Sequence, residues 1–297
     1  MNRTFSLTKR NISLFIRDKA AVFFSFLSTI ILVALYFLFI AQMYRQGIAG
    51  SPSGDTFSKP AQNFLIYLQM MAGVLILNSM SLSMGVFSTI AKDFESGRVD
   101  NFMLTPLRKT DLLVSYLISG FIVSFTLNFL TWIISALLIG ILTGYFVAFG
   151  TFLTGVVILL AASAISSAIM LFITSIVHSS AAIGVIGSIA GTFLGFLCGI
   201  YIPYSSLGSA TVKIGSVLPY THLTIWLKQT LLGDAFKQLS VPDTLKTTLL
   251  NDAFSAKNIG FAGINAPLWV MLIFCGIFAL ICLAAAWFLL KRRISRR

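Results

Sequence analysis

Residues 112–212 contain no lysine, arginine, aspartate or glutamate, and this run limits most tightly what the chain can fold into. A second uncharged run covers residues 61–91. A soluble domain carries about 25% charged residues, whereas this chain has 10% charged and 57% hydrophobic residues. A spanning helix needs about 20 consecutive apolar residues, and a membrane strand would alternate apolar and polar side chains instead. We therefore expect an all-α polytopic membrane protein with a single transmembrane domain over residues 1–297.

The apolar runs predict six transmembrane helices. We expect them at residues 20–43, 61–90, 112–142, 149–177, 181–202 and 267–290. The fifth and sixth are separated by residues 203–266, which Pro203 and Pro219 punctuate. The first part of this segment is too apolar for a solvated loop, so we expect re-entrant helices there, followed by extracellular helices.

The N-terminal segment, residues 1–19, has the pattern of an amphipathic helix. Four apolar residues, Phe5, Ile12, Phe15 and Ile16, share one helical face, and three basic residues, Lys9, Arg10 and Arg17, lie off it. Leu7 and Leu14 blur this pattern. Such a helix lies along a membrane surface. A short flexible basic tail is the alternative.

The distribution of positive charge predicts the orientation. Two thirds of the 21 lysines and arginines fall in the N-terminal segment, in residues 91–111 and in the C-terminal tail. Cytoplasmic segments of membrane proteins carry an excess of these residues. We therefore expect both termini and residues 91–111 on the cytoplasmic side, which an even number of spans permits.

Several functional classes lack their signatures here. The net charge of +12 comes from cations that flank apolar segments, and not from one basic face typical of nucleic-acid binding. No phosphate-binding loop and no catalytic or metal-binding motif is present, so we expect no catalytic residue, no metal site and no cofactor bound by this chain. The three cysteines, Cys198, Cys275 and Cys282, lie in apolar runs and are interpreted as packing residues.

Residues 91–111 form a compact charged segment between the second and third expected spans. Their charged side chains are Lys92, Asp93, Glu95, Arg98, Asp100, Arg108, Lys109 and Asp111. Gly97 permits a tight bend, and Pro106 turns the chain before the next span. A contact with an aqueous partner is one interpretation, with Glu95 and Arg98 as ion-pair residues, and an ordinary solvated loop is the other.

Four glycines, Gly187, Gly191, Gly195 and Gly199, recur at every fourth position in the fifth expected span. Small residues at this spacing let helices approach closely. Contact with another helix of the same chain is one interpretation, and a gate or dimer seam is the other.

The order of these segments, together with Glu95-Ser96-Gly97 and Thr105-Pro106-Leu107-Arg108, resembles the permease subunit of type-2 ABC exporters, the ABC-2 family. The resemblance covers nearly the whole chain. It implies that Glu95, Gly97, Arg98, Thr105 and Pro106 belong to a coupling helix that docks on a separate ATPase subunit, where ATP and Mg bind. It also implies two ATPase copies, a second permease subunit (identical or paralogous) and a plasma membrane of bacterial type.

The same resemblance implies roles for polar and small residues in two spans. It places Gln69, Asn78, Gly187, Gly191, Gly195 and Gly199 along the substrate pathway or the dimer seam. Structural packing is the alternative for each of them. We expect leucine in place of Gly191 or Gly195 to abolish transport.

The predicted function is that of a permease subunit in an ATP-driven exporter. Its expected spans carry essentially no ionisable residue, so the cargo should be apolar or amphipathic: a drug, a natural product, an antimicrobial peptide or a lipid-linked molecule. An ion-coupled secondary transporter is one alternative, although such proteins usually need intramembrane carboxylates or histidines. A membrane assembly or sensor protein without a transport cycle is the other.

Overall fold

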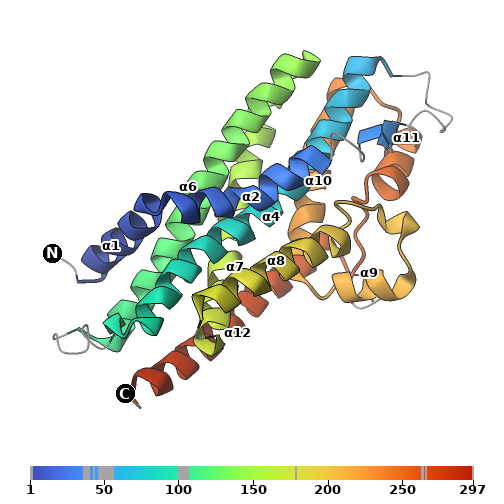
Figure 1. The fold of residues 1–297 in the computed structure, drawn as a ribbon. Helices are drawn as coiled ribbons and strands as arrows, with labels where there is room; N and C mark the ends of the chain where they lie inside the picture. The colour runs from blue at the N-terminus through green and yellow to red at the C-terminus, as the bar shows by residue number, and fades with distance from the viewer. Residues whose placement is uncertain are drawn as a thin grey trace.

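The computed structural model describes residues 3–35, 41–42, 44–45, 57–99, 107–177, 179–261, 264 and 266–295. Within these residues the chain is helical apart from turns and one bridge pair, Phe261 with Ile264. The helices form an elongated bundle, with the segment that contains α9 and α11 at one end and both chain termini toward the other (Figure 1). The expectation of an all-α architecture is confirmed for the described residues.

Five helices are long and apolar enough to cross a membrane in the part of the chain that the structure describes. They are α4 (Lys59–Glu95), α6 (Lys109–Thr143), α7 (Phe149–Ile176), α8 (Ser180–Leu197) and α12 (Leu268–Ser295). The first expected span, 20–43, corresponds to the shorter α2 (Lys19–Leu35), and most of its remainder lies outside the described residues. Five of the six expected spans are therefore represented by helices of spanning length within the described residues, and the first stays a prediction.

Helix α4 occupies the centre of the bundle and packs against α2, α6, α7, α8 and α10. Its first turn is capped by Ser58, whose hydroxyl accepts a hydrogen bond from the Ala61 N–H at 3.4 Å. Its 37 residues correspond to about 55 Å, which exceeds the roughly 30 Å of a bilayer core. The helix continues to Glu95, five residues beyond the expected end at residue 90.

Helix α8 ends at Leu197, five residues before the expected end at residue 202. Gly199 has a φ of 61°, in the left-handed region that favours glycine, and the chain leaves the helix there. The N–H groups of Ile200 and Tyr201 both donate to the Gly195 carbonyl at 3.1 Å. The predicted boundary was wrong because a glycine in an apolar run fits a helix interior as well as a helix end.

The segment between α8 and α12 contains α9 (Ser209–Gly215), α10 (Pro219–Gln238), α11 (Asp243–Thr248) and a π-helical turn (Leu249–Ala253). Helix α10 has 20 residues, longer than the short helices expected, and packs against α4, α7 and α12. Lys228 on α10 is fully buried, and its ammonium donates to the carbonyls of Gly199 at 2.7 Å and Phe254 at 3.0 Å. A buried cation thus ties the end of α8 to α10 and to the residues after the π turn.

Helix α1 (Arg3–Arg17) packs against α6 and α4. Its buried residues are Leu7, Thr8, Asn11 and Phe15. Phe5 and Ile16 are 62% and 59% exposed. The apolar face predicted from the sequence is therefore split: Phe15 packs on the bundle, whereas Phe5 and Ile16 lie on a second apolar face that is turned away from it.

Candidate functional site

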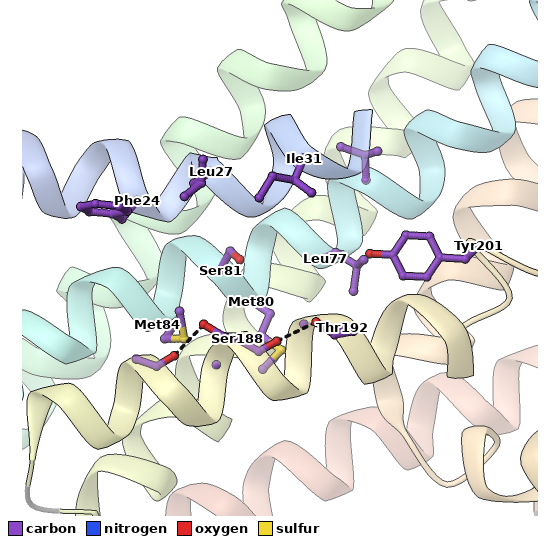
Figure 2. A pocket seen from close by; sticks show the side chains of 14 residues that line it. Phe24, Leu27, Ile31, Leu77, Met80, Ser81, Met84, Ser188, Thr192 and Tyr201 are labelled. Carbon is purple, nitrogen blue, oxygen red and sulfur yellow. Dashed lines mark hydrogen bonds between the residues drawn. The ribbon is translucent and has the colours of Figure 1, made fainter. Parts of the chain in front are cut away.

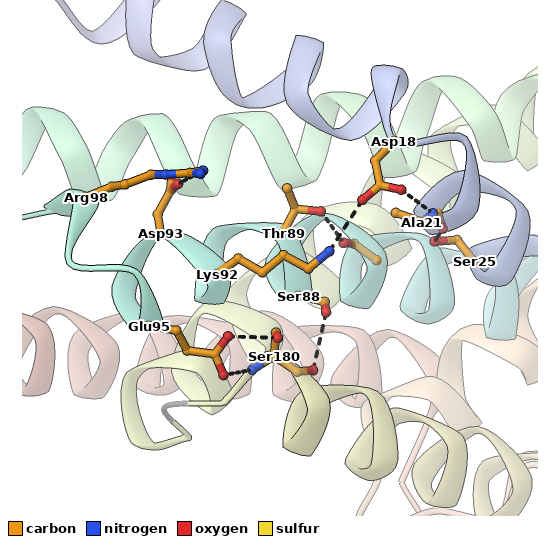
Figure 3. A network of polar contacts seen from close by, with 11 residues as sticks. Asp18, Ala21, Ser25, Ser88, Thr89, Lys92, Asp93, Glu95, Arg98 and Ser180 are labelled. Carbon is orange, nitrogen blue, oxygen red and sulfur yellow. Dashed lines mark hydrogen bonds and ion pairs between the residues drawn. The ribbon is translucent and has the colours of Figure 1, made fainter.

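The last turn of α4 carries a cluster of polar contacts to α1, α2 and α8, and Figure 3 shows those to Asp18 before α2 and to Ser180 of α8. We refer to it as the α4-end cluster, and its members are Arg10, Asp18, Lys92, Asp93, Glu95, Arg98 and Ser180. Three of these residues, Lys92, Asp93 and Glu95, project from α4 within four positions of each other. Each bonds a different partner helix, so the end of α4 is a junction.

Glu95 connects α4 to the first turn of α8. One of its carboxylate oxygens accepts a hydrogen bond from the Ser180 N–H, and the other accepts one from the Ser180 hydroxyl, both at 2.9 Å. The Ser88 hydroxyl donates to the Ser180 carbonyl at 3.3 Å. A carboxylate at a helix N-terminus satisfies N–H groups that lack a partner within the helix and complements the helix dipole. Glu95 therefore caps α8 from outside that helix.

Asp93 connects α4 to α1. Its side chain is 3% exposed and accepts two hydrogen bonds from the Arg10 guanidinium, at 2.7 and 3.1 Å. The Arg98 guanidinium lies 3.5 Å from the same carboxylate. Two-pronged arginine–carboxylate pairs of this kind are strong and geometrically specific. The sequence pointed to Arg98 as a contact for another protein, and the structure places it beside a carboxylate of its own chain.

Lys92 connects α4 to the start of α2. Its ammonium lies 3.4 Å from a carboxylate oxygen of Asp18. The other oxygen of Asp18 accepts a hydrogen bond from the Ala21 N–H at 2.9 Å and so caps α2. That N–H holds the pKa of the Asp18 carboxyl below its usual range, with a smaller contribution from Lys92.

Gly97 turns the chain directly after α4. Its φ is 70°, which a residue with a side chain rarely adopts. The bend expected there is therefore present. Thr105 and Pro106, the other two residues predicted for the coupling element, lie outside the described residues.

A groove of about 420 Å³ opens between α2, α4 and α8 (Figure 2). Its walls are apolar and hydroxyl-bearing side chains with three glycines on α8. The lining residues are Phe24, Leu27, Ile31, Val74, Leu77, Met80, Ser81, Met84, Gly184, Gly187, Ser188, Gly191, Thr192 and Tyr201. We call this cavity the three-helix groove.

The four glycines predicted to form one face have four different environments. A Cβ at Gly187 would lie 1.2 Å from the Met84 sulfur, and one at Gly195 would lie 2.0 Å from the Tyr201 ring. A Cβ at Gly191 would meet nothing within 4 Å. Gly199 ends the helix. Close packing within the chain accounts for two of the glycines, and the groove wall accounts for Gly191.

The two polar residues predicted to line a pathway, Gln69 and Asn78, are each 1% exposed and do not line the three-helix groove. The Asn78 amide donates to the Asn128 side chain at 3.2 Å, between α4 and α6. The Asn128 amide in turn donates to the Leu75 carbonyl at 2.9 Å. Asn78 thus joins α4 to α6 within this chain, and its place along a substrate pathway stays a prediction.

The sequence did not single out Arg10, Asp18, Asp93 and Ser180, which bring α1, α2 and α8 to the end of α4. Asp93 is one of eight charged residues in the segment 91–111, and nothing in its sequence position distinguished it from the other seven. Ser180 follows Ser179, whose hydroxyl accepts a hydrogen bond from the Ala182 N–H. That local capping pattern was the signal available for the start of α8.

The sequence model that describes the ABC-2 family transporter protein matches residues 51–288. No curated protein matches the chain. The matched region begins after α2 and includes α4, α6, α7, α8 and most of α12. The last turn of α4 and two of the three walls of the groove lie inside it.

Proposed function

The chain belongs to the ABC-2 transporter family, and from this premise we propose that it is the permease subunit of an exporter driven by a separate ATPase. The family supports a membrane transport subunit. The ATPase partner, the outward direction and the class of cargo are our proposals, and the α4-end cluster and the three-helix groove support them.

One observation supports the mechanism most strongly: the α4-end cluster joins the same three helices that form the groove. Lys92 links α4 to the start of α2, and Glu95 links α4 to the start of α8. The groove lies between α2, α4 and α8. A push on the residues that follow α4 therefore acts on the ends of all three walls at once.

In the proposed cycle, ATP-driven closure of the ATPase moves residues 91–111 together with α1. Asp93 transmits this movement to α1 through its bonds to Arg10. Glu95 transmits it to α8 by holding the Ser180 N–H. A change in the separation of α2 and α8 alters the width of the groove and releases its contents toward the outer side.

The lining of the groove supports an apolar or amphipathic cargo, such as a drug, a natural product, an antimicrobial peptide or a lipid-linked molecule. The lining residues are apolar, glycine, serine, threonine or tyrosine, and none of them carries a charge at neutral pH. Met80 and Met84 provide flexible side chains that adapt to varied apolar shapes. The absence of carboxylate and imidazole side chains from this lining disfavours the alternative of an ion-coupled transporter.

The complete transporter in this proposal contains a second permease subunit, identical or paralogous, and two ATPase copies that bind ATP and Mg. It lies in a plasma membrane of bacterial type with both termini in the cytoplasm. The basic residues near the chain ends support that orientation. In Figure 1 the two termini lie toward the same end of the bundle, which agrees with it.

The test is co-expression of the chain with its candidate ATPase, followed by reconstitution in liposomes. We expect the ATPase to co-purify and lipophilic dyes or amphipathic peptides to stimulate ATP hydrolysis. Glu95→Gln should preserve assembly and hydrolysis but reduce export, because a neutral amide caps α8 less well. Asp243→Asn, the same change at the start of α11, is the matched control and should leave export unchanged. Full function without any ATPase would reject the proposal.

A further inference from the structure

A second groove lies between α1 and α6, along the edge of the face by which α1 packs on the bundle. Its volume is about 510 Å³. It is lined by one lysine, three hydroxyl side chains and four apolar side chains: Lys9; Thr4, Thr8 and Ser13; Phe5, Ile12, Ile118 and Ile122. We propose that this α1–α6 groove binds an anionic phospholipid of the cytoplasmic leaflet, with the headgroup at Lys9 and one acyl chain along α6.

The α1 wall presents one continuous helical face. Phe5, Lys9 and Ile12 are spaced by four and three positions, and Ser13 follows Ile12. Residues at this spacing lie above one another on a helix. The buried residues Leu7, Asn11 and Phe15 hold α1 on the bundle and do not line the groove, whereas Thr8 lies at the boundary between the packing face and the groove.

The polar end of the groove favours an anion. Lys9 is exposed, and neither the Lys9 side chain nor the Ser13 side chain has a hydrogen bond or ion pair within the described residues. The other two hydroxyls are already engaged: Thr4 donates to Asp111 at 3.3 Å, and Thr8 donates to the Thr4 carbonyl at 2.9 Å. Helix α1 contains no acidic residue. Lys9 and Ser13 are therefore the groups available to hold a phosphate.

The apolar end of the groove continues along the outer surface of α6. Ile118 and Ile122 are 37% and 39% exposed, and Val114, one turn before Ile118, is 39% exposed. The three residues form a stripe at four-residue spacing that runs from the start of α6 into its apolar length. A charged head beside a hydrocarbon stripe matches the two parts of a phospholipid.

A lipid in the α1–α6 groove would affect the contact between α1 and the end of α4. Lys9 is adjacent in sequence to Arg10, which pairs with Asp93 at the end of α4. A lipid in the α1–α6 groove stabilises α1 in the position that this ion pair requires. The inference uses the proposed cytoplasmic placement of α1 but not the proposed transport cycle.

The test is a lipid titration of the purified full chain in detergent, measured by native mass spectrometry. Phosphatidylglycerol is compared with phosphatidylcholine, which has the same acyl chains but no net charge. Basic residues near a membrane surface each contribute about 1 kcal/mol to binding of anionic lipid, or roughly fivefold in affinity. We therefore expect Lys9→Gln to weaken phosphatidylglycerol binding roughly fivefold and to leave phosphatidylcholine binding unchanged.

Arg17→Gln is the matched control, since it removes one exposed charge from the same helix but lies outside the groove. It should retain the binding of the parent chain. Ile122→Trp fills the apolar end and should weaken the binding of both lipids. Equal losses of phosphatidylglycerol affinity in Lys9→Gln and Arg17→Gln would indicate diffuse electrostatic attraction and overturn the proposed site. Unchanged lipid binding in both Lys9→Gln and Ile122→Trp would also overturn it. Because lipid binding is measured without ATP, failure of the transport proposal does not affect this result.

Discussion

The glycines of α8 give the sharpest test of the three-helix groove, because their environments predict different outcomes for the same substitution. Alanine is favoured over glycine inside a helix by about 0.5–1 kcal/mol. At Gly191 an added methyl group meets nothing within 4 Å. Gly191→Ala should therefore raise the free energy of unfolding by that amount.

At Gly195 the added methyl group would lie 2.0 Å from the Tyr201 ring, so the ring must move. Overpacking of this kind costs about 1–3 kcal/mol, which outweighs the helical gain and leaves a net loss of about 1 kcal/mol. At Gly187 the obstacle is the Met84 sulfur at 1.2 Å. A methionine side chain adapts at low cost. The free energy of unfolding of Gly187→Ala should therefore lie between those of Gly191→Ala and Gly195→Ala.

The assay for stability is unfolding of the purified chain by a denaturing detergent in mixed micelles. For function, Gly191→Leu places a side chain in the groove and should abolish dye export without loss of stability. Gly276→Leu is the matched control, since Gly276 lies within α12, also has nothing within 4 Å and does not line the groove. The reasoning is refuted if Gly191→Ala is the least stable of the three alanine variants, or if Gly191→Leu exports normally.

Four further variants test three contacts that hold the helices together. Asn128→Leu removes the buried hydrogen bonds between α6 and α4 and should cost about 1–2 kcal/mol in the same unfolding assay. Arg10→Gln and Asp93→Asn should show a coupling energy of about 1–3 kcal/mol in a double-mutant cycle of unfolding free energies. Additive losses of stability in the double variant would contradict the ion pair between these residues. Lys228→Met removes the ammonium from two carbonyls and should lose about 1–3 kcal/mol, so an unchanged midpoint would argue against that contact.

The sequence predicted the helices well because hydropathy is a local property. Uncharged runs located α4, α6, α7, α8 and α12, and the charged segment located the junction after α4. The end of α8 was misplaced because the conformation of Gly199 depends on contacts that an apolar run does not reveal. The first expected span is represented by the 17 residues of α2, and its remaining length lies largely outside the described residues.

The site was predicted less completely because its contacts join residues far apart in sequence. Glu95 was singled out, but its partner within the chain is Ser180, 85 positions later. Asp93 pairs with Arg10, 83 positions earlier. Nothing in the spacing of either residue identifies such a partner. Docking of an ATPase on Glu95, Gly97, Arg98, Thr105 and Pro106 stays a prediction.

The buried lysine of α10 has a consequence for the order in which the protein is assembled. Lys228 is synthesised before Phe254, 26 positions later, and before α12, against which α10 packs. An ammonium group without its acceptors is costly to remove from water. Lys228 must therefore remain hydrated until Phe254 has been synthesised, and α10 completes its packing only after α12 has been inserted. A chain truncated before Phe254 should leave Lys228 open to water-soluble amine reagents that the complete protein excludes.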